Sequence, residues 1–270
     1  MITDVGQKSL LEYIAGKRRA WITAVQIGTG GLLADGQLEY PIQETTITFG
    51  EVNDGVVLLR ADLPISDTGA YYELAVLSDN RLKNIAATRL LVTNFSGAES
   101  YLEGNYTIGS LYARNGAQNV GVVTSGTETI TLTNSNRDYS LLVSDDTFRL
   151  AYSNLNNQTT AVQVRMYNPN GDHWLYSFSP AESVYAVEIW DLIDFTPVGS
   201  PVWSDILRTE FTVVSAGSAT DFRFDGMQAV KNIDLDDYGI VDSSVLADPV
   251  VVSEGVEQPI EYALEFSFNG

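Results

Sequence analysis

The chain has 270 residues, of which 15 are Lys or Arg, 35 are Asp or Glu and none is Cys, so its formal net charge is −20. That charge opposes binding to nucleic-acid phosphates and anionic lipids, and the lack of cysteine excludes disulfides and thiolate metal sites. No apolar run reaches the ~20 residues that a membrane helix needs, so we expect no membrane insertion. We also expect no export signal, because the basic residues near the N-terminus follow the first apolar stretch instead of preceding it.

The first predicted element is a short helix over residues 5–15. Asp4 and Gln7 have the spacing of a capping box, and Gly16 can end the helix in a left-handed cap. An apolar stripe at helical spacing consists of Leu10, Leu11 and Ile14. The cations that follow suit the negative end of the helix better than they suit a nucleic-acid site, and they are Lys17, Arg18 and Arg19.

A buried strand and a glycine turn are predicted next. From Trp21 to Ile27 the side chains alternate with period 2, and both faces are mostly apolar. The glycines of the following IGTGG sequence free the backbone for a left-handed or otherwise tight turn, and they are Gly28, Gly30 and Gly31. A phosphate-binding loop is the alternative, but neither GxGxxG nor GK[ST] is present, which favours the turn.

Three more strands are predicted, over residues 46–52, 55–63 and 70–77, the last followed by a turn at residues 78–80. Glu73 lies in the middle of the last of these strands, among apolar residues. A glutamate that faces inward needs a cation or backbone donors, and Arg60 and Arg89 are candidate partners. A structural role is favoured over a catalytic one, because no motif places a second carboxylate beside it.

This order of elements resembles the N-terminal domain of bacteriophage tail-fibre proteins of the tail-collar type. In that family a short helix precedes a strand that ends in a GTG-like turn, and a later strand carries an acidic residue before an apolar group and a turn. The segments 27–30 and 73–80 match those two places, whereas Ala75 stands where the family usually has glycine.

The resemblance covers residues 1–95 and implies a structural virion protein, a tail-fibre or baseplate component that connects the tail to host recognition without catalysis. It implies assembly in the host cytoplasm, other tail or baseplate proteins as partners, and a homo-oligomer for which a trimer is favoured. We expect the protein interface to include Leu10, Leu11, Ile14 and Trp21.

The predicted fold is mainly β, with a short N-terminal helix followed by two antiparallel β-sandwich-like domains. We expect a tail-attachment domain over residues 1–95, a glycine-rich connecting segment over 96–126 and an antiparallel β-sandwich-like domain over 127–270. Alternation of apolar and polar residues predicts the strands of the last domain over 127–133, 139–143, 148–152, 161–167, 173–179, 184–190, 211–214, 222–225 and 260–268.

Catalytic motifs are missing from the sequence, since there is no GxSxG elbow and no cysteine, so we expect neither an enzyme nor a cofactor. His173 is the single histidine and follows the turn sequence NPNGD, which indicates a turn or strand-edge position. One acidic cluster has oxygen ligands of the kind that calcium prefers, but its spacing is not that of an EF-hand and a solvated loop is favoured. It consists of Asp234, Asp236 and Asp237.

Two other functions remain open. A carbohydrate-binding module would recognise a bacterial surface glycan through the C-terminal sheet, with exposed aromatic side chains stacked on the sugars. The candidate aromatic residues are Tyr101, Tyr106, Tyr112, Trp174 and Tyr176. A polysaccharide depolymerase would need two carboxylates that converge from distant strands, an arrangement that leaves no local motif.

Overall fold

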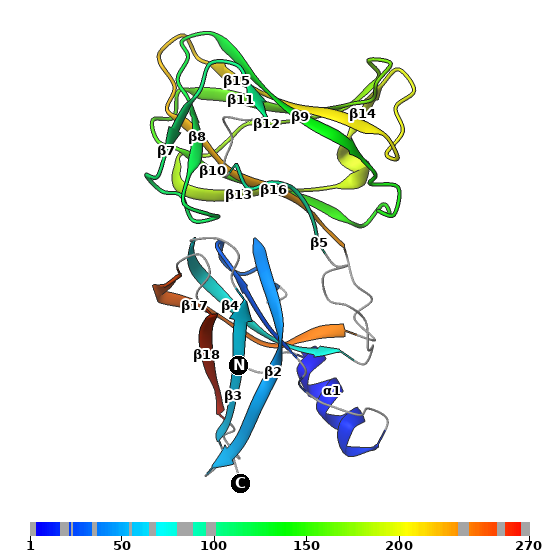
Figure 1. Cartoon of the computed structure of the whole chain (residues 1–270), viewed down its shortest axis with the longest axis vertical. Coiled ribbons are helices and arrows are strands. Elements are labelled where there is room, and N and C mark those ends of the chain that lie inside the picture. Colours follow the sequence, from blue (N-terminus) through cyan, green and yellow to red (C-terminus); the bar gives the residue numbers. More distant parts are fainter. Residues whose placement is uncertain are drawn as a thin grey trace. The chain divides into compact units, whose positions relative to one another are not determined.

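The computed structural model describes residues 4–16, 22, 24–33, 37–53, 56–64, 69–79, 89–95, 101–231, 238–252 and 257–265 (Figure 1). The chain divides into two compact units, one made of residues 1–88 with 233–270 and the other of residues 89–232. The second unit is therefore inserted into the first. No helix within the described ranges is long and apolar enough to cross a membrane.

The first unit contains the helix α1 (Asp4–Ile14) and a six-stranded sheet with the order β17-β4-β1-β2-β3-β18. The strands of this sheet are β1 (Ala24–Gly28), β2 (Pro41–Asn53), β3 (Val56–Pro64), β4 (Gly69–Asp79), β17 (Tyr238–Val252) and β18 (Glu257–Glu265). The predicted helix is confirmed, and Gly16 follows it with a φ of 71°, the left-handed conformation that glycine adopts most easily. The amide of Gly16 donates to the carbonyl of Tyr13, and α1 lies beside β17.

The C-terminal strands complete the sheet of the first unit. Asp79 of β4 pairs with Tyr238 of β17, and Pro64 of β3 pairs with Glu257 of β18, so both flanks of the N-terminal strands are covered. A strand edge presents unpaired N–H and C=O groups, and these two strands satisfy them. The observed units thus differ from the predicted boundaries, because residues 233–270 belong with the N-terminal strands and not with the β-sandwich.

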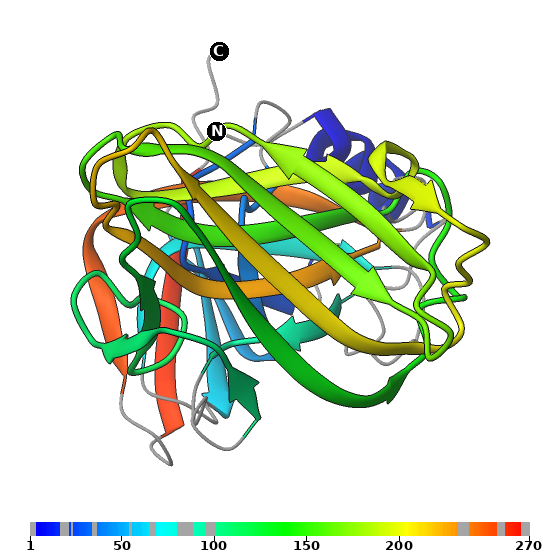
Figure 2. The ribbon, with the colours of Figure 1, turned by 90° about the horizontal axis from the view of Figure 1, so that it is seen from above.

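The second unit is an antiparallel sandwich of two sheets, which lie one above the other in Figure 1. One sheet has the order β13-β10-β16-β8-β7, with β5 also paired to β16, and its strands are β5 (Arg89–Thr93), β7 (Thr107–Gly109), β8 (Asn119–Val122), β10 (Thr147–Asn154), β13 (Ser183–Asp191) and β16 (Phe222–Val230). The other has the order β14-β12-β11-β15-β9-β6, and its strands are β6 (Leu102–Glu103), β9 (Thr127–Arg137), β11 (Thr159–Tyr167), β12 (His173–Phe178), β14 (Thr196–Val198) and β15 (Ile206–Ser215). Figure 2 is seen from above, onto this second sheet.

One core fills the space between these two sheets. Alternate residues of β11 face it, since Val162, Val164 and Met166 are fully buried, as the sequence pattern predicts. Phe222 and Phe224 enter the same core from β16 in the opposite sheet. The mainly β, sandwich-like prediction is therefore confirmed.

Two predictions for this unit differ from the structure. Residues 139–143 form a turn and not a strand, because Asp138 accepts the amide of Ser140 and the amide of Leu142 donates to the carbonyl of Tyr139. In the segment predicted to be a connection, residues 101–126 carry β6, β7 and β8, and all three strands pair within the sandwich. The β5 and β14 strands of this unit, and β17 of the first unit, were not predicted.

Candidate functional site

Glu73 and the IGTGG turn form one hydrogen-bonded assembly in the first unit. β1 and β4 are paired so that Gly28 lies opposite Glu73, whose side chain is fully buried. The Oε1 atom of Glu73 accepts the amides of Gly30 at 3.1 Å and Tyr40 at 2.8 Å, and Oε2 accepts the amide of Glu39 at 2.8 Å. The two sequence segments that carry the tail-fibre resemblance are thus in direct contact.

Close packing, not a left-handed backbone, explains the glycine at position 28. A Cβ atom on Gly28 would lie 2.1 Å from Oε1 of Glu73 and 2.4 Å from the carbonyl oxygen of Tyr40, far inside van der Waals contact. None of Gly28, Gly30 and Gly31 has a positive φ, so of the predicted left-handed or otherwise tight turn the structure contains the second form. Glycine is needed at position 28 because Glu73 and the backbone of Tyr40 approach it closely.

Three backbone amides stabilise the buried carboxylate of Glu73. They account for its burial without Arg60 or Arg89, the two candidate partners. Burial raises the pKa of Glu73 to about 7, while the three backbone donors lower it and the nearby Glu39 raises it. Arg60 is exposed and lies 3.8 Å from Asp62, and the side chain of Arg89 is outside the described residues. Glu73 therefore has a structural role.

The same carboxylates exclude a phosphate from the turn. The amide of Gly30 donates to Glu73 and the amide of Gly31 donates to Oε2 of Glu39 at 2.8 Å. A phosphate loop needs such amides free to face the ligand. Anionic side chains of the chain itself already take the place of the anion, in agreement with the predicted turn.

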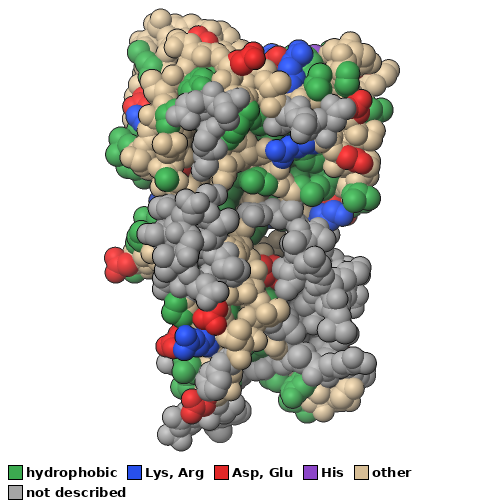
Figure 3. Space-filling view, in the orientation of Figure 1, with side chains coloured by type: hydrophobic (Ala, Val, Ile, Leu, Met, Phe, Trp, Pro, Cys, Tyr) green, Lys and Arg blue, Asp and Glu red, His purple; other side chains and the backbone are tan. Residues whose placement is uncertain are grey.

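The interface candidates on α1 differ in exposure. Leu11 is 68% exposed and Ile14 is 71% exposed, and Tyr13 between them is also exposed, whereas Leu10 is half-buried. Apolar side chains of α1 lie on the surface at the lower right of Figure 3. Trp21, the fourth candidate, lies outside the described residues. Residues 11–14 thus leave apolar surface in contact with solvent at the C-terminal end of the helix.

A loop of the second unit is fixed by a buried carboxylate that the sequence analysis missed. Asp225 on β16 accepts the amide of Asn115 at 2.8 Å and that of Arg114 at 3.1 Å, both on Oδ2. Burial raises the pKa of Asp225 to about 7, while these two amides, the charge of Arg114 and the Tyr185 hydroxyl lower it. The guanidinium of Arg114 also lies 4.1 Å from the centre of the Tyr185 ring. The only sequence signal is an acid within the alternating FRFD stretch, two residues after Arg223 and on the same strand face.

Four of the five candidate sugar-stacking aromatics are partly buried and pack against the core. Trp174 stacks on Trp203 with ring centroids 4.6 Å apart, and Tyr176 stacks on Trp190 at 4.3 Å. Tyr176 also donates its hydroxyl to Oε1 of Glu188 at 2.7 Å. Tyr101 and Tyr106 are half-buried against the same core. Of the five candidates, Tyr112 has the exposed ring, with 41% of its surface accessible and a φ of 62°.

Among the predicted sites that the structure describes, the last is His173, the single histidine. His173 is the first residue of β12 after the NPNGD turn, its ring lies 4.5 Å from that of Tyr167, and its Nδ1 contacts the Gly171 carbonyl at 3.3 Å. No group of three or more His, Cys, Asp or Glu residues that could hold a metal ion occurs in the described part of the chain. The sites outside it are Lys17, Arg18, Arg19, Asp234, Asp236 and Asp237.

The chain matches no protein-family model and no curated protein. It is similar to the structure of a family 11 carbohydrate-binding module from Clostridium thermocellum, with 12% identity over 54% of this chain and 98% of that one and a TM-score of 0.44. An exo-beta-agarase has 10% identity over 53% of this chain and 25% of its own, with a TM-score of 0.44. The enzymatically active domain of tailspike protein 4 of bacteriophage CBA120 has 15% identity over 56% of this chain and 21% of its own, with a TM-score of 0.35. All three TM-scores lie below 0.5, so these likenesses carry no weight for function.

Proposed function

We propose that the chain is a structural attachment protein of a bacteriophage tail, whose first unit docks onto other tail or baseplate proteins through α1. The observation that carries this proposal is the apolar surface of α1. Leu11 and Ile14 are spaced three residues apart, so they share one helix face, and about 70% of each side chain is exposed. Burying the rest of each in an interface would contribute about 1 to 2 kcal/mol.

The packing of the first unit supports docking through this helix. α1 lies beside β17, β17 pairs with β4, and Glu73 on β4 fixes the turn that follows β1. The helix is thus connected through paired strands to the segments that resemble the tail-fibre family. A rigid support of this kind lowers the entropy that an interface must lose on binding. On this proposal the protein is a homo-oligomer, with a trimer favoured, and is located in the virion.

The test is incorporation of the protein into phage tails. Mass spectrometry of purified tails should detect the wild-type protein, and Leu11→Ser with Ile14→Ser should reduce its amount at least tenfold. Leu141→Ser is the matched control, because Leu141 is 74% exposed but lies in the second unit. The proposal is wrong if purified tails lack the wild-type protein, or if the double variant is incorporated as well as the control.

A second candidate function is recognition of a bacterial surface glycan by the second unit. One observation favours it: the exposed ring of Tyr112, a residue with a φ of 62°, lies on the loop that Asp225 holds through the amides of Arg114 and Asn115. Glycan recognition and tail attachment are compatible, since each would use a different unit. Binding of the purified chain to an oligosaccharide array tests this function, and no saturable binding to any sugar would exclude it.

A further inference from the structure

One edge of the sandwich is a long strand with a neighbour on one side only. β13 ends the order β13-β10-β16-β8-β7, so it pairs with β10 and with no other strand in the described part of the chain. Its register with β10 is unbroken from Ala186 to Asp191. This stretch contains no proline, no lysine and no bulge, which are features by which edge strands usually avoid pairing with another chain. The outer edge of β13 is therefore of the kind to which a further strand can be added.

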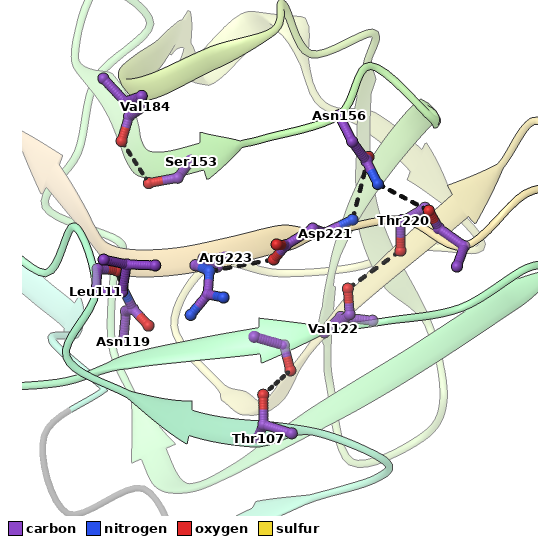
Figure 4. A network of polar contacts seen from close by, with 12 residues as sticks. Thr107, Leu111, Asn119, Val122, Ser153, Asn156, Val184, Thr220, Asp221 and Arg223 are labelled. Atoms are coloured by element: carbon purple, nitrogen blue, oxygen red, sulfur yellow. Dashed lines mark hydrogen bonds and ion pairs between the residues drawn. The ribbon is translucent and has the colours of Figure 1, made fainter.

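Hydrogen bonds at the two ends of β13 show which of its residues face this outer edge. The hydroxyl of Ser153 on β10 donates to the carbonyl of Val184 at 2.7 Å, as Figure 4 shows. The amide of Leu192 donates to the carbonyl of Asp146, just before β10, at 2.9 Å. In an antiparallel pair, residues that bond to the partner strand alternate with residues that point away from it. The even-numbered residues of β13 therefore bond toward β10, and the odd-numbered residues point to the outer edge.

The chain itself occupies the two ends of the outer edge. The amide of Tyr185 donates to Oγ of Ser183 at 3.2 Å, and the same hydroxyl donates to the carbonyl of Tyr185 at 2.7 Å. The amide of Asp191 donates to Oδ2 of Asp194 at 3.0 Å. Between these ends, no described side chain bonds to the backbone of the two remaining odd-numbered residues. Their two N–H and two C=O groups are thus the part of the edge that an added strand can use.

These two residues are Val187 and Ile189, and the side chain between them belongs to Glu188. Val187 and Ile189 are half-buried on the outer face of the sheet, because the even-numbered residues face the core. Oε1 of Glu188 accepts the hydroxyl of Tyr176 at 2.7 Å, and no Lys or Arg of the described chain pairs with this half-buried carboxylate. Burial raises the pKa of Glu188, and the bond from Tyr176 lowers it. The edge therefore offers apolar side chains on one face and a carboxylate without a cation on the other.

A second copy of β13 does not fit this edge. Antiparallel pairing of Val187 with Ile189 of the other copy would place the two Glu188 side chains directly opposite one another, and like charges in that position are destabilising. The formal net charge of −20 on each chain adds to the repulsion. A cation opposite Glu188 has the reverse effect, because it pairs with a carboxylate that has no cation in the described chain.

We propose that the outer edge of β13 binds an extended segment of a partner protein as an added strand. The segment carries a Lys or Arg opposite Glu188 and apolar side chains beside Val187 and Ile189. Its backbone bonds to the N–H and C=O groups of these two residues, while its side chains select it by charge and polarity. This surface belongs to the second unit, so it is separate from the docking surface on α1.

Calorimetric titration of the full chain with a terminally blocked peptide of sequence TTVKVTT tests the proposal. Saturable binding is expected, and the peptide TTVEVTT should bind at least tenfold more weakly, because its central glutamate would face Glu188. Methylation of the amide nitrogen of either valine should weaken binding at least tenfold, since these amides bond to β13. Methylation of the central lysine amide, which points away from β13, is the control and should change binding less than threefold.

Two variants of the chain test the same contact from the other side. Val187→Pro removes an N–H of the outer edge and no bond to β10, so it should weaken TTVKVTT binding at least tenfold with an unchanged unfolding midpoint. Glu188→Gln should reduce the preference for TTVKVTT over TTVEVTT to less than threefold. Glu182→Gln is its matched control, because it removes an equal charge from an exposed residue just before β13 and should leave the preference unchanged.

Three results would overturn the proposal. The first is no saturable binding of TTVKVTT to the wild-type chain. The second is equal binding of TTVKVTT by wild type and Val187→Pro. The third is a concentration-dependent dimer of the wild-type chain in sedimentation equilibrium that Val187→Pro abolishes, because this result would assign the edge to a second copy of the chain.

Discussion

Gly28→Ala is expected to disrupt the assembly around Glu73 in the first unit. The added methyl group would lie 2.1 Å from Oε1 of Glu73 and 2.4 Å from the backbone oxygen of Tyr40, so the carboxylate must move. Displacing Oε1 breaks its bonds to the amides of Gly30 and Tyr40, which are 3.1 and 2.8 Å long. Each bond to a charged group contributes about 1.5 to 3 kcal/mol, and overpacking costs a further 1 to 3 kcal/mol. We expect a loss of about 4 to 9 kcal/mol in the free energy of unfolding of this unit.

The measurement is hydrogen exchange by mass spectrometry along a urea series, read separately on peptides from residues 24–40 and from the second unit. The matched control is Gly50→Ala on β2 of the same sheet, where the nearest atom to an added Cβ is 3.7 Å away. The control should leave the free energy of unfolding within about 0.5 kcal/mol of wild type. If Gly28→Ala unfolds at the same urea concentration as the control, close packing of Glu73 against residue 28 does not stabilise the unit.

Two further predictions concern the second unit. Because burial raises the pKa of Asp225 from 3.8 to about 7, the folded state binds a proton more readily than the unfolded state. The protonated Asp225 therefore stabilises the fold fully below about pH 4, and this stabilisation is lost as the pH rises through 7. Between these pH values the free energy of unfolding should fall by up to about 1.4 kcal/mol per pH unit. Urea unfolding at several pH values should show that slope removed in Asp225→Asn, and an identical slope in the variant would contradict the assignment. Phe148→Ala should lower the free energy of unfolding by about 3 to 5 kcal/mol, because the buried ring stacks on Trp190 and Trp203. Val184→Ala, at an exposed residue, is the control and should change it by less than about 0.5 kcal/mol. Equal thermal midpoints for the two variants would show that the aromatic cluster does not stabilise the sandwich.

The strands of the sandwich were predictable because their burial is one-sided. Ile130 and Leu132 of β9 are buried, and the neighbouring threonines at positions 129 and 131 are more accessible. Such a period-2 pattern is a local property of the sequence. The same pattern misled at residues 139–143, where Asp138 fixes a turn and leaves Leu141 and Val143 exposed. Alternation alone does not distinguish a strand from a turn that an acidic side chain stabilises.

The partners of polar groups were less predictable than the groups themselves. The need of a buried Glu73 for a cation or backbone donors follows from the cost of burying a charge. The donors proved to be the amides of Gly30, Glu39 and Tyr40, and an amide is present at every residue but proline, so no sequence signal marks these three. Arg223 was missed for a related reason. Its guanidinium packs against Gly109, and the glycine-rich composition around this residue suggested a connection instead of strands.

The insertion of the second unit explains why the domain boundaries could not be predicted. The chain leaves the first unit after β4 and returns to it in β17, and these strands are antiparallel neighbours that pair at Asp79 and Tyr238. The second unit begins with β5 and ends with β16, which are also antiparallel neighbours and pair at Arg89 and Val230. In each unit the two chain ends at the junction are therefore close together, the condition under which a domain can be inserted without disturbing its host. Pairing between strands so distant in sequence is set by the free edges of β4 and β16, and no local pattern records it.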